Sequence, residues 1–189
     1  GGRETGAAMV EHEVPELVSI TGSTRAGAQV MSAASATLKD VHLELGGKAP
    51  AQVFADVDID QTAREIALGA FFNAGQDCTA VTRVLVEESI HAEFAQALAA
   101  AASALAVGGE DADLGPLNSA AQLDRVEGFM ARLPANARIL TGGKRTGTGF
   151  YFAPTVVDGV VQTDEVVAEE IFGPVVTVQP FVDESEALE

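Results

Sequence analysis

Four short segments of this 189-residue chain carry side chains that could do chemistry. The first contains Cys78, the single cysteine, in the segment NAGQDCT at residues 73–79, where Gly75 permits an unusual backbone turn. A lone cysteine is usually an inert, buried side chain, but one held in a connector on a rigid scaffold can serve as a nucleophile. The residues alone leave both interpretations open.

The second candidate is Glu44, which alternates with apolar neighbours in VHLEL at residues 41–45 and is followed by two glycines. Alternation at period two predicts a strand. On that strand the carboxylate is either an ordinary exposed side chain or a buried group that acts as a general base. The local pattern favours neither alternative.

Two further segments have features of nucleotide-binding sites. TGSTRAG at residues 21–27 lies between an expected strand and an expected helix, where glycines, hydroxyls and a helix N-terminus suit a phosphate. It matches neither the GxGxxG fingerprint nor a Walker loop, so the pattern is not specific. EEIFGP at residues 169–174 is most simply a loop that enters the last strand, although a carboxylate two residues from an aromatic ring could also hold a ribose and its attached ring.

The remaining reactive residues argue against metal chemistry. His12, His42 and His91 have no metal-ligand spacing, and one cysteine permits neither an internal disulfide nor a cysteine-based zinc cluster. We therefore expect no metal site. A cysteine hydrolase that works without a cofactor would require the fold to bring one histidine to Cys78.

Alternating strands and helices are expected to position these segments. We expect strands at residues 17–20, 41–45, 52–54, 81–86, 138–141 and 175–181. We expect helices over residues 26–37, from Asp58 or Asp60 to about residue 76, from a Ser89 cap to Gly108, and behind a capping box of Ser119 and Gln122. This alternation predicts an α/β fold whose mainly parallel sheet is covered by helices on both faces.

Composition excludes several classes of protein. Hydrophobic residues make up 47% of the chain, which is too many for a disordered segment. With 11 Lys and Arg against 28 Asp and Glu, the net charge of −17 excludes a nucleic-acid or anionic-membrane binder. No apolar run approaches the roughly 20 residues that span a bilayer, and the chain starts with neither Met nor a signal peptide. We expect a cytoplasmic protein, present here as a piece of a longer chain.

Taken together, the segments resemble the aldehyde dehydrogenase superfamily. ITGST at residues 20–24, LELGGK at 43–48, NAGQDC at 73–78 and EEIFGP at 169–174 occur in the family's order, and GPL at 115–117 also fits. Glu44 and Cys78 lie 34 residues apart, as the family's general base and nucleophile do. Four motifs in order are far more specific than any one of them, and the resemblance spans essentially the whole chain.

The resemblance implies that the full-length protein containing this chain oxidises a small aldehyde with NAD or NADP. Cys78 would attack the aldehyde to give a thiohemiacetal and then a thioester, with its own backbone N–H as one oxyanion donor. Glu44 would deprotonate the water that releases the acid. Lys48 belongs to the family motif, but we assign it no chemical step.

The resemblance also implies where the cofactor lies. Seven residues would contact it or shape its site: Gly22, Ser23 and Gly27 near the pyrophosphate, Glu170 and Phe172 at the nicotinamide ribose and ring, and Gly2 and Gly6 in the helix against the adenosine. Asp77 departs from many relatives and resembles bacterial aminobutyraldehyde-type dehydrogenases. Its carboxylate could attract an aldehyde that carries an amine, or merely hydrogen-bond the loop.

Family members are more than twice as long, so the resemblance implies an internal fragment. Residues 1–45 would be the end of a dinucleotide-binding domain, and residues 46–189 a catalytic domain that is incomplete at its C-terminus. We expect the fragment alone to be inactive and the full-length protein to be a homo-oligomer. The alternatives are a non-catalytic structural or assembly module and a cofactor-independent cysteine hydrolase.

Overall fold

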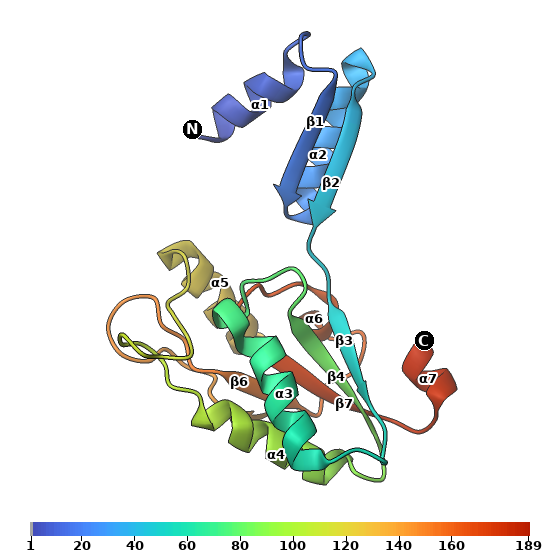
Figure 1. The fold of residues 1–189 in the computed structure, drawn as a ribbon, viewed down its shortest axis with the longest axis vertical. Coiled ribbons are helices and arrows are strands. Elements are labelled where there is room, and N and C mark those ends of the chain that lie inside the picture. The colour runs from blue at the N-terminus through green and yellow to red at the C-terminus, as the bar shows by residue number, and fades with distance from the viewer. Residues whose placement is uncertain (1) are drawn as a thin grey trace. The chain divides into compact units, whose positions relative to one another are not determined.

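The structure is a computed structural model that describes residues 2–189. The chain divides into two compact units, one that ends at Gly47 and one that runs from Lys48 to Glu189. We call them the N-terminal unit and the C-terminal unit. Figure 1 shows the helices and strands of each.

The N-terminal unit is a helix followed by one βαβ crossover. Its elements are α1 (Arg3–Glu11), β1 (Leu17–Gly22), α2 (Thr24–Ala34), the short 3-10 turn η1 (Ser35–Thr37) and β2 (Asp40–Leu45). The two strands pair in parallel, and parallel strands need a crossover such as α2. Every second residue of both strands is partly buried, so one face packs on α2 and the other is exposed.

A glycine sets the distance between α2 and the strands. Gly27 is buried, and a Cβ at this position would lie 2.7 Å from Cδ2 of Leu45. An ordinary contact begins at about 3.4 Å, so with a side chain at this position either the Leu45 side chain or the helix would have to move. Gly27 therefore has a packing role within its own unit.

The C-terminal unit is built on a five-stranded sheet in the order β3-β4-β7-β6-β5. Its strands are β3 (Ala49–Val53), β4 (Val81–Glu87), β5 (Arg138–Thr141), β6 (Thr155–Asp158) and β7 (Val175–Phe181). Its helices are α3 (Ile59–Phe71), η2 (Phe72–Gly75), α4 (His91–Ala104), α5 (Ala120–Ala131), α6 (Glu165–Ala168) and α7 (Glu184–Leu188). All neighbouring strands are parallel except the edge strand β5, which pairs antiparallel with β6.

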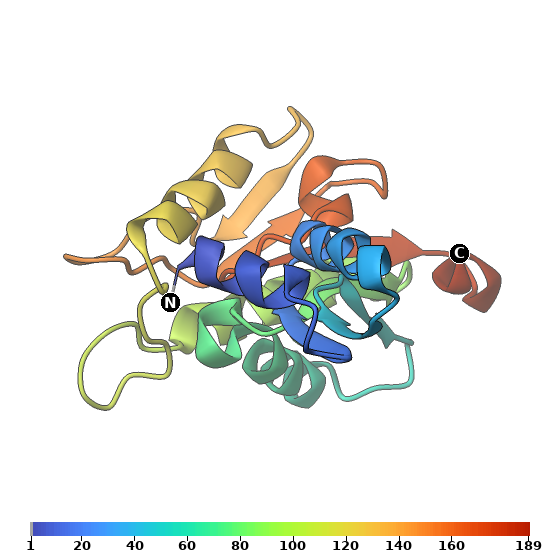
Figure 2. The ribbon, with the colours of Figure 1, turned by 90° about the horizontal axis from the view of Figure 1, so that it is seen from above.

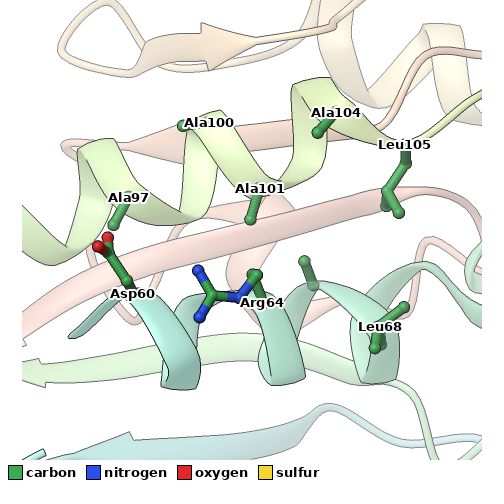
Figure 3. Close-up of a pocket in the computed structure, with 9 residues that line it drawn as sticks. Asp60, Arg64, Leu68, Ala97, Ala100, Ala101, Ala104 and Leu105 are labelled. Carbon is green, nitrogen blue, oxygen red and sulfur yellow. The ribbon is translucent and has the colours of Figure 1, made fainter. Parts of the chain in front are cut away.

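Helices cover both faces of this sheet, as the sequence predicts. In Figure 2, α3 and α4 lie on one side of the strands, and α5 and α6 lie on the other. Nearly every residue of β6 and β7 is buried, which is typical of parallel strands that have helices on both sides. The largest fully buried side chains include Phe71, Phe94 and Leu98, from α3 and α4. The mainly parallel α/β fold is confirmed.

The structure corrects the expected end of α3. Asp58 caps this helix, because its side chain accepts a hydrogen bond from the backbone N–H of Gln61 at 2.9 Å. The helix ends at Phe71 instead of near residue 76, because Asn73 and the two residues after it have positive φ. Left-handed backbone cannot continue a right-handed helix.

The expected boundaries of α4 are also wrong. Its N-cap is Ile90, without a side-chain bond, because the Ser89 hydroxyl instead donates to Glu87 at 3.0 Å. The helix ends at Ala104, four residues before Gly108. Strand β6 was not expected at all, because its four residues, TVVD, are too few to show a period.

Within residues 2–189, no helix is long and apolar enough to cross a membrane. The same described residues include no group of three or more His, Cys, Asp or Glu side chains that could hold a metal ion.

Candidate active site

Three segments with reactive residues enter neighbouring strands at the same edge of the sheet. Lys48 directly precedes β3, the loop with Cys78 precedes β4, and EEIFGP directly precedes β7. Because β3, β4 and β7 are adjacent and parallel, their amino ends meet at one edge. Segments that are more than 120 residues apart in the sequence therefore converge at one place.

The loop before β4 presents Cys78 to solvent. Asn73, Ala74 and Gly75 all have left-handed backbone, with φ values of 50°, 56° and 69°. Consecutive left-handed residues reverse the chain after α3, and Cys78 follows in the next turn, where it is exposed. Cys78 is therefore not the buried side chain that one interpretation of the sequence expects, and its role as a nucleophile stays a prediction.

The cysteine loop touches the EEIFGP loop through its backbone. Gly75 lies so close to Gly173 that a Cβ at position 75 would be 2.2 Å from the carbonyl oxygen of Gly173 and 3.0 Å from the nitrogen of Pro174. Only glycine fits at such a distance and with this φ. The contact fixes the cysteine loop against the loop that contains Glu170 and Phe172.

Gln76 ties a third loop to this pair. Its side-chain oxygen accepts a hydrogen bond from the backbone N–H of Asn118 at 2.8 Å. Its amide nitrogen donates to the carbonyl oxygen of Asn73 at 3.1 Å and to that of Pro116 at 3.4 Å. The GPL segment is thus anchored to the cysteine loop by one side chain.

Asp77 hydrogen-bonds its own loop. Its Oδ1 atom accepts from both the backbone N–H and the hydroxyl of Thr79, each at 2.8 Å. These two bonds hold the pKa of the Asp77 carboxyl below its usual value. The carboxylate beside Cys78 is therefore ionised near neutral pH, and the loop-bonding alternative for Asp77 is observed.

Helix α5 holds the EEIFGP loop by its carbonyl groups. The side-chain amide of Gln122 donates to the carbonyl oxygens of Ile171 at 2.9 Å and of Phe172 at 2.7 Å. Arg125, one turn later, donates to the carbonyl oxygen of Glu170 at 2.5 Å. Phe172 has a φ of 58°, which is rare for a bulky residue and indicates that its surroundings enforce the conformation.

The expected capping box at the start of α5 forms only in part. The Ser119 hydroxyl accepts from the backbone N–H of Gln122 at 3.2 Å, so this serine is the N-cap. The Gln122 side chain does not return the bond and instead binds the EEIFGP loop. Sequence reasoning thus missed a residue that shapes the site, because the capping pattern already explained it.

Lys48, directly before β3, binds the same region. Its ammonium donates to the carbonyl oxygen of Val166 in α6 at 3.0 Å, just before EEIFGP. Burial and, to a lesser extent, the nearby Arg83 charge lower the pKa of Lys48 from 10.5 to about 8, although the Glu170 carboxylate opposes them. Lys48 is therefore a structural contact of the site whose charge can change in mildly alkaline solution.

The remaining candidates belong to the N-terminal unit. Glu44 lies near the end of β2, opposite Thr21 in β1, so it shares the carboxyl edge of the two strands with Gly22 and Ser23. Such edges are the usual place for ligands in parallel α/β units. The Glu44 side chain is 60% exposed, and its Oε1 atom lies 3.1 Å from Nε2 of His42.

The turn between β1 and α2 leads directly into the start of a helix. Ser23 caps α2, because its hydroxyl accepts from the backbone N–H of Ala26 at 3.2 Å. Gly22 and Ser23 thus stand at a helix N-terminus, where backbone N–H groups suit a phosphate. Gly2 is the N-cap of α1, and Gly6 lies within that exposed helix with no heavy atom within 4 Å of a Cβ.

His91, the histidine of the C-terminal unit, does not pair with Cys78. It follows β4, whereas Cys78 precedes that strand, so the two lie at opposite ends of a seven-residue strand. The His91 ring instead lies 3.3 Å from the buried Asp158. This placement argues against a Cys78–His91 hydrolase pair.

Comparison with known proteins decides the family. The sequence model described as "Aldehyde dehydrogenase family" matches residues 1–189. The chain belongs to the aldehyde dehydrogenase family. The expected resemblance is therefore confirmed over the whole chain.

Individual relatives of this aldehyde dehydrogenase chain are similar in both sequence and fold. It is 38% identical to aminoaldehyde dehydrogenase 2, peroxisomal, of Malus domestica, over 100% of this chain and 39% of the relative. It is also 38% identical to betaine aldehyde dehydrogenase of Rhizobium etli, over 100% of this chain and 40% of that protein. The structure of betaine aldehyde dehydrogenase from Staphylococcus aureus in complex with NAD+ superposes with a TM-score of 0.95 at 36% identity, over 100% of this chain and 39% of that one.

The chain thus spans about 39% of the length of the relatives it matches. The relatives include proteins that are named as peroxisomal, from Malus domestica, and as chloroplastic, from Beta vulgaris. The cytoplasmic location expected from the sequence stays a prediction.

Proposed function

We propose that the complete protein containing this aldehyde dehydrogenase chain oxidises an aldehyde to a carboxylic acid with NAD or NADP, through a covalent intermediate on Cys78. The observation that carries the proposal is the contact between Gly75 and Gly173. It holds an exposed cysteine against the loop with Glu170 and Phe172, and the proposed reaction requires the carbon attached to the cysteine sulfur to lie beside the hydride acceptor. The relatives solved with NAD+ support the choice of cofactor.

The residues present fit such a cofactor. Gly22 and Ser23, at the N-terminus of α2, would face its pyrophosphate. Glu170 and Phe172 would hold the nicotinamide ribose and ring, and α5 fixes the backbone of both residues. When bound, the nicotinamide accepts a hydride from the substrate carbon.

In the proposed reaction, the Cys78 thiolate attacks the aldehyde carbon and forms a thiohemiacetal, while the backbone N–H of Cys78 stabilises the developing oxyanion. Loss of the hydride from that carbon leaves a thioester. Glu44 then removes a proton from water, the hydroxide attacks the thioester carbon, and the carbon–sulfur bond breaks. The products are the acid and the free Cys78 thiolate.

Replacement of Cys78 by Ser in the complete protein tests the proposal. We expect NADH formation from aldehyde to fall to background, because a serine hydroxyl is not ionised near neutral pH. Binding of NAD+, followed by fluorescence, should remain, which serves as the control for folding. Undiminished NADH formation would reject Cys78 as the nucleophile, and ester cleavage without any NADH formation in the unaltered protein would favour a cofactor-independent hydrolase.

We further propose an aldehyde with a cationic amino group as the substrate class. The supporting observations are the ionised Asp77 next to Cys78 and the aminoaldehyde and betaine aldehyde dehydrogenases among the relatives. Asp77→Asn keeps an acceptor for the two Thr79 bonds but removes the charge. The KM for a cationic aldehyde should rise about tenfold, as the loss of one ionic contact implies, whereas the KM for a neutral aldehyde of equal length should not change. Equal effects on both would count against this substrate class.

A further inference from the structure

The exposed face of β1 and β2 carries a hydrogen-bonded row of three side chains. The Ser19 hydroxyl lies 3.2 Å from Nδ1 of His42, and Nε2 of His42 lies 3.1 Å from Oε1 of Glu44. Ser19 is directly opposite His42 in the strand register, and Glu44 is two residues further along β2 on the same face. Both ring nitrogens of His42 are therefore engaged, one of them with the proposed general base.

One neutral form of the ring makes both bonds. The Ser19 hydroxyl donates to Nδ1, and the Nε2–H group donates to the Glu44 carboxylate. When the ring takes up a proton, Nδ1–H donates and the hydroxyl accepts, so the row persists in either charge state. In both cases the bond occupies Oε1 of Glu44 and leaves Oε2 to receive a proton from water.

We propose that His42 is a positioning residue that orients the Glu44 carboxylate for hydrolysis of the thioester. The inference rests on the proposed function, in which Glu44 deprotonates the attacking water. A carboxylate on a three-bond side chain that is 60% exposed has many orientations, and a fixed donor at 3.1 Å selects one of them. Position 42 lies just before the LELGGK motif of residues 43–48, and the period of two along the strand places residues 42 and 44 on one face.

The lifetime of the acyl-enzyme measures this step directly. In the complete protein, an activated ester acylates Cys78 without any cofactor, and intact-mass spectrometry follows the loss of the acyl group. His42→Ala should acylate at the wild-type rate but lose the acyl group about tenfold more slowly, because general-base steps are sensitive to position. His42→Gln, which keeps a side-chain donor, should lose the acyl group within about threefold of the wild-type rate.

Matched variants separate the possible failures. His12→Ala, at an exposed histidine of the same unit, should leave acylation and hydrolysis unchanged. If Glu44→Gln hydrolyses the acyl-enzyme at the wild-type rate, the proposed function itself fails. If Glu44→Gln is slow and His42→Ala is not, only the role of His42 fails. An equal loss of acylation and hydrolysis in His42→Ala that His42→Gln does not restore would also overturn it, because that pattern indicates a structural defect.

Discussion

The contact between Gly75 and Gly173 can be tested by adding a single methyl group. In Gly75→Ala, the new Cβ would lie 2.2 Å from the Gly173 carbonyl oxygen, whereas an ordinary contact begins at about 3.4 Å. The two loops would therefore have to separate by roughly 1 Å. Gly147 provides a matched control, because its φ of 66° is close to the 69° of Gly75 but no heavy atom lies within 4 Å of a Cβ there.

Both variants place an alanine in left-handed backbone, but only Gly75→Ala also creates a steric clash. Left-handed backbone costs a non-glycine residue roughly 1–2 kcal/mol, so Gly147→Ala should lose about that much free energy of unfolding. Gly75→Ala should lose a further 1–3 kcal/mol or so, which is typical of an overpacked interior. In the complete protein, a displacement of about 1 Å between the cysteine and nicotinamide loops should also reduce kcat about a hundredfold.

Urea denaturation gives the free energies of unfolding, and NADH formation gives kcat. The expected pattern is a moderate stability loss with normal kcat for Gly147→Ala, and a larger stability loss with low kcat for Gly75→Ala. Equal stability losses, or a normal kcat in Gly75→Ala, would refute the argument that backbone contact between these loops aligns the site.

Three further predictions concern individual side chains. Gln122→Ala leaves the Ile171 and Phe172 carbonyls without their amide donor and should lower the free energy of unfolding by about 1–3 kcal/mol in urea denaturation. Gln61→Ala, on the exposed face of α3, should change it by no more than about 0.5 kcal/mol. Similar losses in the two variants would contradict a stabilising role for the Gln122 bonds. The pKa of Lys48 is about 8 in the native state and 10.5 in a free lysine, so the native state releases this proton at a lower pH than the unfolded state does. The free energy of unfolding of wild type should therefore rise relative to that of Lys48→Met between pH 8 and 10.5. A difference between the two proteins that stays constant over this range would exclude the lowered pKa. Cys78 is exposed and is the single cysteine, so iodoacetamide should add one alkyl group to the native protein without denaturant, and slow labelling would indicate that the thiol is covered.

Local patterns in the sequence predicted most strands and the α/β class, because apolar periodicity reports directly on burial. The strand at residues 175–181 agrees residue for residue with β7. The sequence places the end of α3 too late because Ala74, with a φ of 56°, gives no local signal for the left-handed backbone that begins at Asn73. Strand β6 was missed because it exists only through its pairing with β7 and β5.

In the candidate site too, local patterns predicted some residues, whereas contacts between distant parts of the chain could not be predicted. Cys78, Glu44 and the glycine-rich segments could be named from residue types and motifs. Their supports could not, because Gln122 and Arg125 act on carbonyl groups 45 to 50 residues away, and no local pattern encodes such partners. The contact between His42 and Glu44 could have been predicted, because a period of two places both side chains on one face of a strand.

Three loops with candidate site residues meet at the amino ends of β3, β4 and β7, and none of the candidate residues lies at the carboxyl ends of these strands. The turn at Glu88 and Ser89, which follows β4, is exposed and lies a full seven-residue strand, about 20 Å, from the loop with Cys78. A fluorophore or affinity peptide inserted there would report on the protein without reaching its chemistry. The chain thus offers a natural handle for immobilisation, at the far end of the strand that leads from Cys78.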